Sequence, residues 1–191
     1  MSTRQIVELR NKIEIKKIVP SFPEIDNKKF PTMGELNDWD YARDRIYELL
    51  DGASYTCQSA VIQQYNEYIV GMNSYSNALA PISFISTDER NIPIIGFPYC
   101  EPIVKSAEYY PYNDEESLMK LGAFSAEKGI NFETVRRFIL DVNKVCLEYD
   151  LNSDDIWYNL TNIGYNPSLG LRVIDYGLVY GVEDRKFELV M

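Results

Sequence analysis

The sequence contains no histidine, and this absence excludes several classes of active site. Without an imidazole there is no Ser-His or Cys-His nucleophile pair, and no metal site with histidine ligands. A general base in this protein would therefore have to be a carboxylate. Cysteine is also scarce, with three thiols that lie far apart in the sequence, at Cys57, Cys100 and Cys146. An odd number at such spacing fits a reducing cytosol rather than a disulfide framework.

Long apolar runs are missing as well. No stretch approaches the roughly 20 residues that span a bilayer, and the first ten residues lack the apolar core of a signal peptide. We therefore expect no membrane partner and a cytoplasmic location. The 191 residues are 46% hydrophobic, which is enough for one globular domain with a sizeable core.

Positive charge is sparse outside the N-terminal segment. Residues 1–30 carry 7 Lys/Arg against 4 Asp/Glu, residues 31–191 carry 12 against 25, and the whole chain has a net charge of −10. An acidic body argues against nucleic-acid binding through a broad basic surface. It suits a basic protein partner, but it also suits a simple role in solubility, and the sequence leaves both open.

Hydrophobic periodicity predicts an α+β fold. Residues 4–19 fit either a short helix or an edge strand, and three prolines make 20–37 an irregular arm. The periodicity predicts helices and strands as follows: helices over about 38–50, 58–72, 113–128 and 131–149, and strands over about 82–85, 92–97, 162–166 and 170–175. The side chains expected to face inward include Met72 in the second helix and Phe132, Phe138 and Val142 in the fourth. We expect the final hairpin to lie against this fourth helix.

Two short motifs near the end of the chain carry the chemistry. An apolar run over 171–174 stops at Asp175, and Gly177 permits a sharp turn just after it. Asn162 stands directly before the other predicted strand of the hairpin. Carboxylate and amide oxygens are ligands that suit a divalent cation such as Mg²⁺. An ordinary turn is the alternative reading, because Asp-x-Gly is common in turns.

The two motifs and the interval between Asn162 and Asp175 resemble the catalytic loop and metal-binding loop of the protein-kinase-like fold. The likeness is greatest to small kinase-like proteins encoded by bacteriophages. It implies a reduced kinase-like fold with a small sheet lobe and a helical lobe that ends in a β-hairpin. The implied division is an N-terminal arm at 1–37, a reduced N-lobe at 38–100 and a C-lobe at 101–191.

The resemblance also assigns roles to individual residues. Asp175 and Asn162 would hold a metal ion, with Asn159 as a second candidate for the position of Asn162. Asp155 or Asp154 would be the catalytic base. Both aspartates also fit a helix N-cap or a turn, and this alternative stays open.

Upstream, the resemblance gives Glu67 the ion-pairing position of the first large helix, and Gly52 the turn that covers the phosphates. The sequence departs from the family around both. No lysine occurs over 30–104, and the strand that should carry one would fall over 54–63, where there is barely room for it. A third departure concerns the base, because the residue five before Asn162 is Trp157, which accepts no proton.

These departures predict a catalytically degenerate, pseudokinase-like protein that needs no cofactor and binds a protein partner. If it is phage-encoded, the setting is the cytoplasm of the host cell or the virion. The alternative is a minimal phosphotransferase that uses Mg-ATP, the carboxylate of Asp175, the amide of Asn162 and a cation borrowed from Arg43, Arg45, Lys28 or Lys29.

Overall fold

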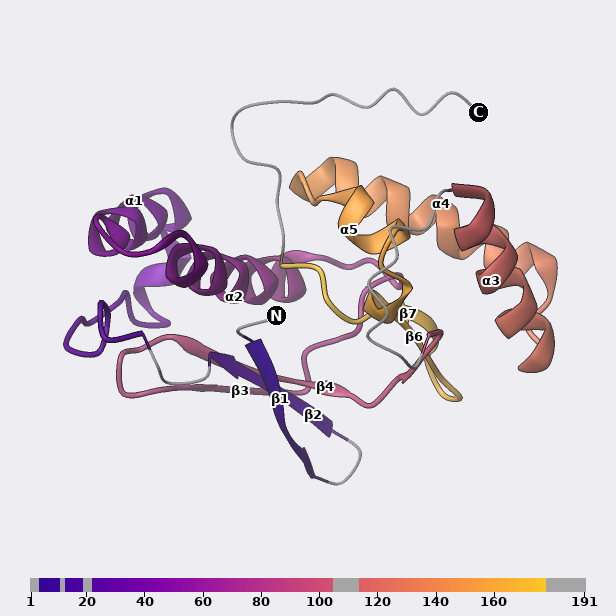
Figure 1. Ribbon diagram of the computed structural model, residues 1–191, viewed down its shortest axis with the longest axis horizontal. Coiled ribbons are helices and arrows are strands. Elements are labelled where there is room, and N and C mark those ends of the chain that lie inside the picture. Colours follow the sequence, from indigo (N-terminus) through magenta and orange to yellow (C-terminus); the bar gives the residue numbers. More distant parts are fainter. Residues whose placement is uncertain (1–3, 11–12, 19–21, 105–113, 178–191) are drawn as a thin grey trace.

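The computed structural model describes residues 4–10, 13–18, 22–104 and 114–177, with side chains described from residue 22 onward. Its helices and antiparallel sheets confirm the predicted α+β class (Figure 1). The helices are α1 (Trp39–Leu50), α2 (Tyr55–Asn73), α3 (Asp114–Glu127), α4 (Phe132–Tyr149) and α5 (Ser153–Trp157), with 3₁₀ turns η1 (Glu35–Asn37) and η2 (Leu160–Asn162). The strands are β1 (Arg4–Arg10), β2 (Ile13–Ile18), β3 (Phe84–Thr87), β4 (Pro93–Pro98), β5 (Glu101–Pro102), β6 (Ile163–Asn166) and β7 (Gly170–Val173).

The strands form a four-stranded sheet in the order β1-β2-β4-β3 and a three-stranded sheet in the order β5-β6-β7. Both predicted hairpins, β3-β4 and β6-β7, are confirmed. Residues 4–10 and 13–18 adopt the strand rather than the helix alternative, and β2 pairs antiparallel with β4 in the middle of the first sheet. The segment that the sequence sets apart as an arm at 1–37 therefore supplies two strands of this sheet.

The rest of the predicted arm packs on its own domain. Ile25, Phe30 and Leu36 are buried in an apolar cluster with α1 and α2. Because burial of such side chains removes apolar surface from water, the segment is part of the core and does not present these side chains to a partner.

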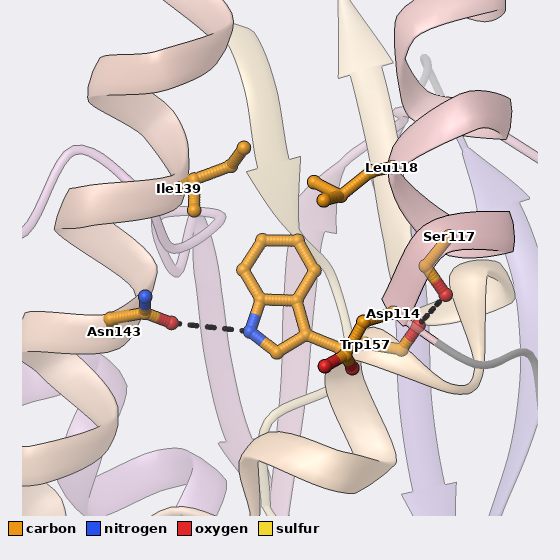
Figure 2. Close-up of a pocket in the computed structure, with 6 residues that line it drawn as sticks. All are labelled: Asp114, Ser117, Leu118, Ile139, Asn143 and Trp157. Atoms are coloured by element: carbon orange, nitrogen blue, oxygen red, sulfur yellow. Dashed lines mark hydrogen bonds between the residues drawn. The ribbon is translucent and has the colours of Figure 1, made fainter. Parts of the chain in front are cut away.

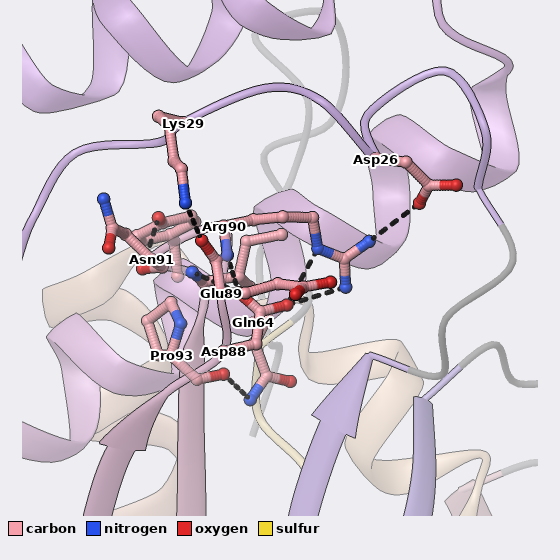
Figure 3. A network of polar contacts seen from close by, with 10 residues as sticks. Asp26, Lys29, Gln64, Asp88, Glu89, Arg90, Asn91 and Pro93 are labelled. Atoms are coloured by element: carbon pink, nitrogen blue, oxygen red, sulfur yellow. Dashed lines mark hydrogen bonds and ion pairs between the residues drawn. The ribbon is translucent and has the colours of Figure 1, made fainter.

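A buried arginine fastens this segment to the β3-β4 turn (Figure 3). The Arg90 guanidinium donates to Asp88 Oδ2 through Nε at 2.8 Å and Nη2 at 2.7 Å, and its Nη1 lies 3.7 Å from Asp26 Oδ1. The main chain of Phe30 donates to Arg90 O at 2.9 Å, and Asn91 Nδ2 donates to Phe30 O at 3.0 Å. The positive charge of Arg90 is therefore paired with two carboxylates, Asp88 in the β3-β4 turn and Asp26 in the N-terminal segment. A buried charge needs such opposite charges.

Local capping explains where α1 and α2 begin. Asp38 accepts from Tyr41 N at the start of α1, where the periodicity predicts a helix to begin, and Ser54 accepts from Cys57 N at the start of α2. The Ser54 cap begins α2 three residues earlier than the periodicity predicts.

The expected burial of Met72 is wrong, because its side chain is 51% exposed near the end of α2. Among the helices of the described segments, none combines the length and the apolar character that a bilayer crossing requires.

The helix α4 runs as predicted, from the Asn131 cap to a left-handed residue at Asp150, whose φ is 54°. Phe138 and Val142 are buried in one cluster with Val173 of β7, so the hairpin lies against α4 as expected. Phe132 does not face inward, and its side chain is 80% exposed. It stands at the first residue of the helix, six residues before Phe138, the first buried residue of α4.

Candidate functional site

The residues expected to form a catalytic loop gather between α5 and β6. Asn162 Nδ2 donates to Asp155 O at 2.9 Å and to Asp155 Oδ2 at 3.1 Å. Asn159 Nδ2 donates to Asn162 Oδ1 at 3.3 Å. The structure therefore brings Asp155, Asn159 and Asn162 together, although the spacing between Asp155 and Asn162 is longer than the family's. The turn of α5 takes up the extra residues.

Asp154 and Asp155 both lie in the first turn of α5. Asn152 caps this turn, since its Oδ1 accepts from Asp154 N at 3.0 Å and from Asp155 N at 3.2 Å. The alternative that places both aspartates at a helix N-terminus therefore agrees with their main-chain position. The N-cap itself is Asn152 and neither aspartate. The side chain of Asp155 contacts Asn162, whose Nδ2 lies 3.1 Å from Asp155 Oδ2.

Asp175 follows β7 beside the same loop. Ile163 pairs with Val173, and Ile174 N donates to Asn162 O at 2.7 Å, so the chain reaches Asp175 directly next to Asn162. Asp175 is half-buried. Within the segments the structure describes, no three His, Cys, Asp or Glu side chains gather as metal ligands. A metal ion there would need amide and main-chain oxygens as well as carboxylates.

The helix α2 holds the residues that follow Asp175. Asn66 Nδ2 donates to Gly177 O at 3.4 Å, and Glu67 Oε1 accepts from Tyr176 N at 3.4 Å. Tyr176 is buried, and its hydroxyl donates to Ala80 O at 3.1 Å. Glu67, expected to pair with a lysine, is thus buried against the main chain of the Asp-Tyr-Gly motif.

Residues 54–63, where the resemblance would place the lysine-bearing strand, belong almost entirely to α2, in keeping with the expected lack of room for a strand there. On the side of β4 away from β3, the neighbouring strand is β2, near the start of the chain, and its register places Lys16 opposite Ile95. Two cations considered as substitutes contact main-chain carbonyls instead: Lys28 Nζ donates to Leu49 O at 2.5 Å, and Lys29 Nζ donates to Glu89 O.

Gly52 ends a helix. Its φ is +74°, directly after the Asp51 C-cap of α1, and no atom lies within 4 Å of the position of an added Cβ. Glycine is the usual residue at this left-handed position. Helix termination by itself therefore explains Gly52, as it does Gly129 after α3, where φ is +69°.

Trp157 occupies the position where the resemblance places a base, and its surroundings hold it firmly (Figure 2). Its Nε1 donates to Asn143 Oδ1 at 3.2 Å, and Ser117 Oγ donates to its carbonyl oxygen at 2.6 Å. Its ring meets that of Phe138 edge to face, with centroids 6.4 Å apart. No local sequence pattern indicates these contacts, because Ser117 and Asn143 come from two other helices, α3 and α4.

The segment between β4 and β5 approaches the hairpin closely at Gly164. An added Cβ there would lie 2.8 Å from Cys100 Cβ and 3.2 Å from the carbonyl oxygens of Cys100 and Glu101. Asn166 Nδ2 donates to Tyr99 O at 2.8 Å and holds the same junction from the hairpin turn. The two parts of the chain thus touch through main chain, and only glycine fits between them.

Gly164→Ala is accordingly expected to destabilise the protein by about 1–3 kcal/mol, since the inserted methyl group meets atoms that cannot move aside alone. Urea unfolding would measure the loss. Gly122→Ala is the matched control, because Gly122 lies in α3 with no atom within 4 Å of an added Cβ. That change should stabilise by about 0.5–1 kcal/mol through helix propensity. Equal effects of the two changes would contradict the close approach.

Two of the three buried thiols, those of Cys57 and Cys146, are poor candidates for a nucleophile. Burial raises the pKa of Cys57 to about 11 and that of Cys146 to about 12. Both groups therefore stay protonated at neutral pH, and a protonated thiol is a poor nucleophile.

No protein-family model, curated protein or solved structure matches the chain. The functional argument therefore depends on the residues and their geometry.

Proposed function

We propose that this chain is a catalytically degenerate, kinase-like protein that acts by binding a protein partner. The observation that carries the proposal is the indole of Trp157, five residues before Asn162. Its N–H is held by Asn143 and its ring packs on Phe138, so it belongs to the core of the helical part. An indole accepts no proton, and the position is therefore built for packing rather than for general base catalysis.

The amide of Asn162 supports the same reading. Its nitrogen donates twice to Asp155, and its oxygen accepts from Asn159 at 3.3 Å. A metal ion that used this oxygen would compete with the contact from Asn159. The resemblance assigns the Asn162 side chain to a metal ion. In the structure this side chain stabilises the loop through hydrogen bonds with Asp155 and Asn159.

A protein partner is supported by the charge and by the exposed apolar side chains of the helical part. The net charge of −10 suits a basic partner. The exposed large apolar side chains of α3 and α4 are Leu118, Met119, Phe132, Leu140 and Leu147. Aromatic residues and methionine are enriched at protein interfaces. The host-cell cytoplasm or a virion is the setting that the phage resemblance implies.

The second candidate is the minimal Mg-ATP phosphotransferase, which two observations favour. Asp155 Oδ2 lies 3.1 Å from Asn162 Nδ2, so a carboxylate stands at the loop in spite of the altered spacing. The strand β2 brings two lysines, Lys16 and Lys17, into the middle of the first sheet. Either lysine would be a phosphate-binding cation of the kind this chemistry uses.

Titration calorimetry with Mg-ATP separates the two functions. For a degenerate site we expect no saturable heat up to about 1 mM nucleotide. A micromolar Kd that is lost in Asp175→Ala, but kept in the matched control Asp44→Ala on the exposed face of α1, would overturn the proposal. In that case Lys16→Ala and Lys17→Ala identify the phosphate-binding lysine, because successive residues of a strand belong to opposite faces of the sheet.

A further inference from the structure

A cavity of about 140 Å³ opens beside Trp157, between α3, α4 and α5 (Figure 2). Its walls are mainly apolar and come from the indole of Trp157 and the side chains of Leu118 and Ile139. The remaining lining residues are Asp114, Ser117 and Asn143. Ser117 Oγ and Asn143 Oδ1 are already engaged with Trp157, as donor and acceptor respectively.

The size of the cavity fits one large apolar side chain. A cavity of about 150 Å³ with aliphatic and aromatic walls binds benzene, so a phenyl ring is a suitable occupant here. Leu118 stands at the opening with 51% of its side chain exposed. Covering it would remove further apolar surface from water, which favours binding.

The charge that the described residues place at the cavity wall is negative. Asp114 is the one charged residue among the six that line the cavity, and the first turn of α3 continues with Glu115 and Glu116. A partner with cations beside its apolar side chain is complementary to this rim. A second copy of this chain is a poor occupant, since each copy has a net charge of −10 and the same three carboxylates.

We propose that this cavity, lined by Trp157, Leu118, Ile139 and Asp114, receives a phenyl-sized apolar side chain of a partner whose adjacent residues are Lys or Arg. This inference rests on the proposed binding function and names the chemistry of the partner. The apolar side chain fills the space against the indole, and the flanking cations lie over the carboxylates at the start of α3. Like other rim charges, these carboxylates mainly select the partner and speed its arrival.

Three capped tripeptides test the two parts of this recognition: Arg-Phe-Arg, Arg-Ala-Arg and Glu-Phe-Glu. The reporter is the indole N–H resonance of Trp157 in a ¹H–¹⁵N spectrum, distinguished from that of Trp39 by the variant Trp39→Phe. We expect a saturable shift of the Trp157 signal with Arg-Phe-Arg and a Kd on the order of 1 mM, as for a fragment. The other two peptides should bind at least ~10-fold more weakly, because each lacks one of the two interactions.

Two variants on α3 serve as a matched pair. Leu118→Gln removes an apolar wall and should weaken Arg-Phe-Arg by about tenfold. Met119→Gln changes a neighbour that is 61% exposed and does not line the cavity, and it should leave the Kd unchanged. Both positions are on the surface, so neither change is expected to impair folding.

Equal binding of Arg-Phe-Arg and Arg-Ala-Arg would overturn the apolar anchor and leave only charge attraction. Equal binding of Glu-Phe-Glu would overturn the cationic flanks. A Trp157 shift that follows protein concentration without peptide would mean that a second copy fills the cavity, and the inference would be wrong. None of these outcomes depends on nucleotide, so failure here is distinct from failure of the calorimetric test of the proposed function.

Discussion

Tyr176→Ala is expected to destabilise the protein by about 3–5 kcal/mol, the range for truncation of a packed aromatic residue. The ring is buried to 1% exposure and meets Phe97 edge to face at 5.9 Å. Its truncation would open a cavity between the first sheet, α2 and the end of β7. Urea unfolding monitored by circular dichroism measures the loss.

Tyr176→Phe separates the ring from the hydroxyl group. It keeps the packing and removes the hydrogen bond to Ala80 O, so it should lose only about 1–2 kcal/mol. If Tyr176→Ala cost no more than Tyr176→Phe, the ring would not be packed as described. A large loss of stability in the alanine variant would mean that the middle residue of the Asp-Tyr-Gly motif packs in the core against Phe97 of β4.

Phe138→Ala should also destabilise by about 3–5 kcal/mol. The side chain is 6% exposed, belongs to the cluster that unites α4 with the β6-β7 hairpin, and packs on the ring of Trp157. The midpoint of urea unfolding reports the change. Because Phe138 supports Trp157, the same variant should also shift the indole N–H resonance of Trp157.

Phe132→Ala is the matched control on the same helix. Its ring is 80% exposed at the first residue of α4, so truncation should change the free energy of unfolding by no more than about 0.5 kcal/mol. Val142→Ala, at a fully buried position, should fall between the two phenylalanine variants. If both buried changes left the unfolding midpoint unaltered, α4 would not be the central helix of this part.

Two roles are possible for the Asn162 side chain in the loop between α5 and β6. In the phosphotransferase its amide oxygen would be a metal ligand. In the degenerate protein the whole amide holds Asp155 and Asn159 in place. The contacts favour the second use, and the indole at position 157 favours it further. The calorimetric test with Mg-ATP is therefore the measurement on which the assignment of function depends.

Much of the fold could be predicted from the sequence because its signals are local. Asp38 and Asn131 cap helices through contacts with residues three positions ahead, so neighbouring sequence is enough to locate both starts. The two hairpins follow from apolar runs on either side of short turns, at 88–91 and 167–169. Capping and turn chemistry act within a few residues, which is why these elements lie where the pattern predicts.

The positions that only the tertiary structure decided all depend on partners distant in sequence. Lys16 stands opposite Ile95 because a strand from the start of the chain entered the sheet beside β4, and α1 and α2 separate the two in sequence. Trp157 became part of a cavity because Ser117 and Asn143 reach it from α3 and α4. The sequence by itself determined the four long helices α1 to α4, the two hairpins and the candidate residues of the loop, but not the short helix α5. The tertiary structure decided that β2 pairs with β4 and that side chains of α3 and α4 contact the indole. Both outcomes depend on contacts between segments distant in sequence, which no local pattern encodes.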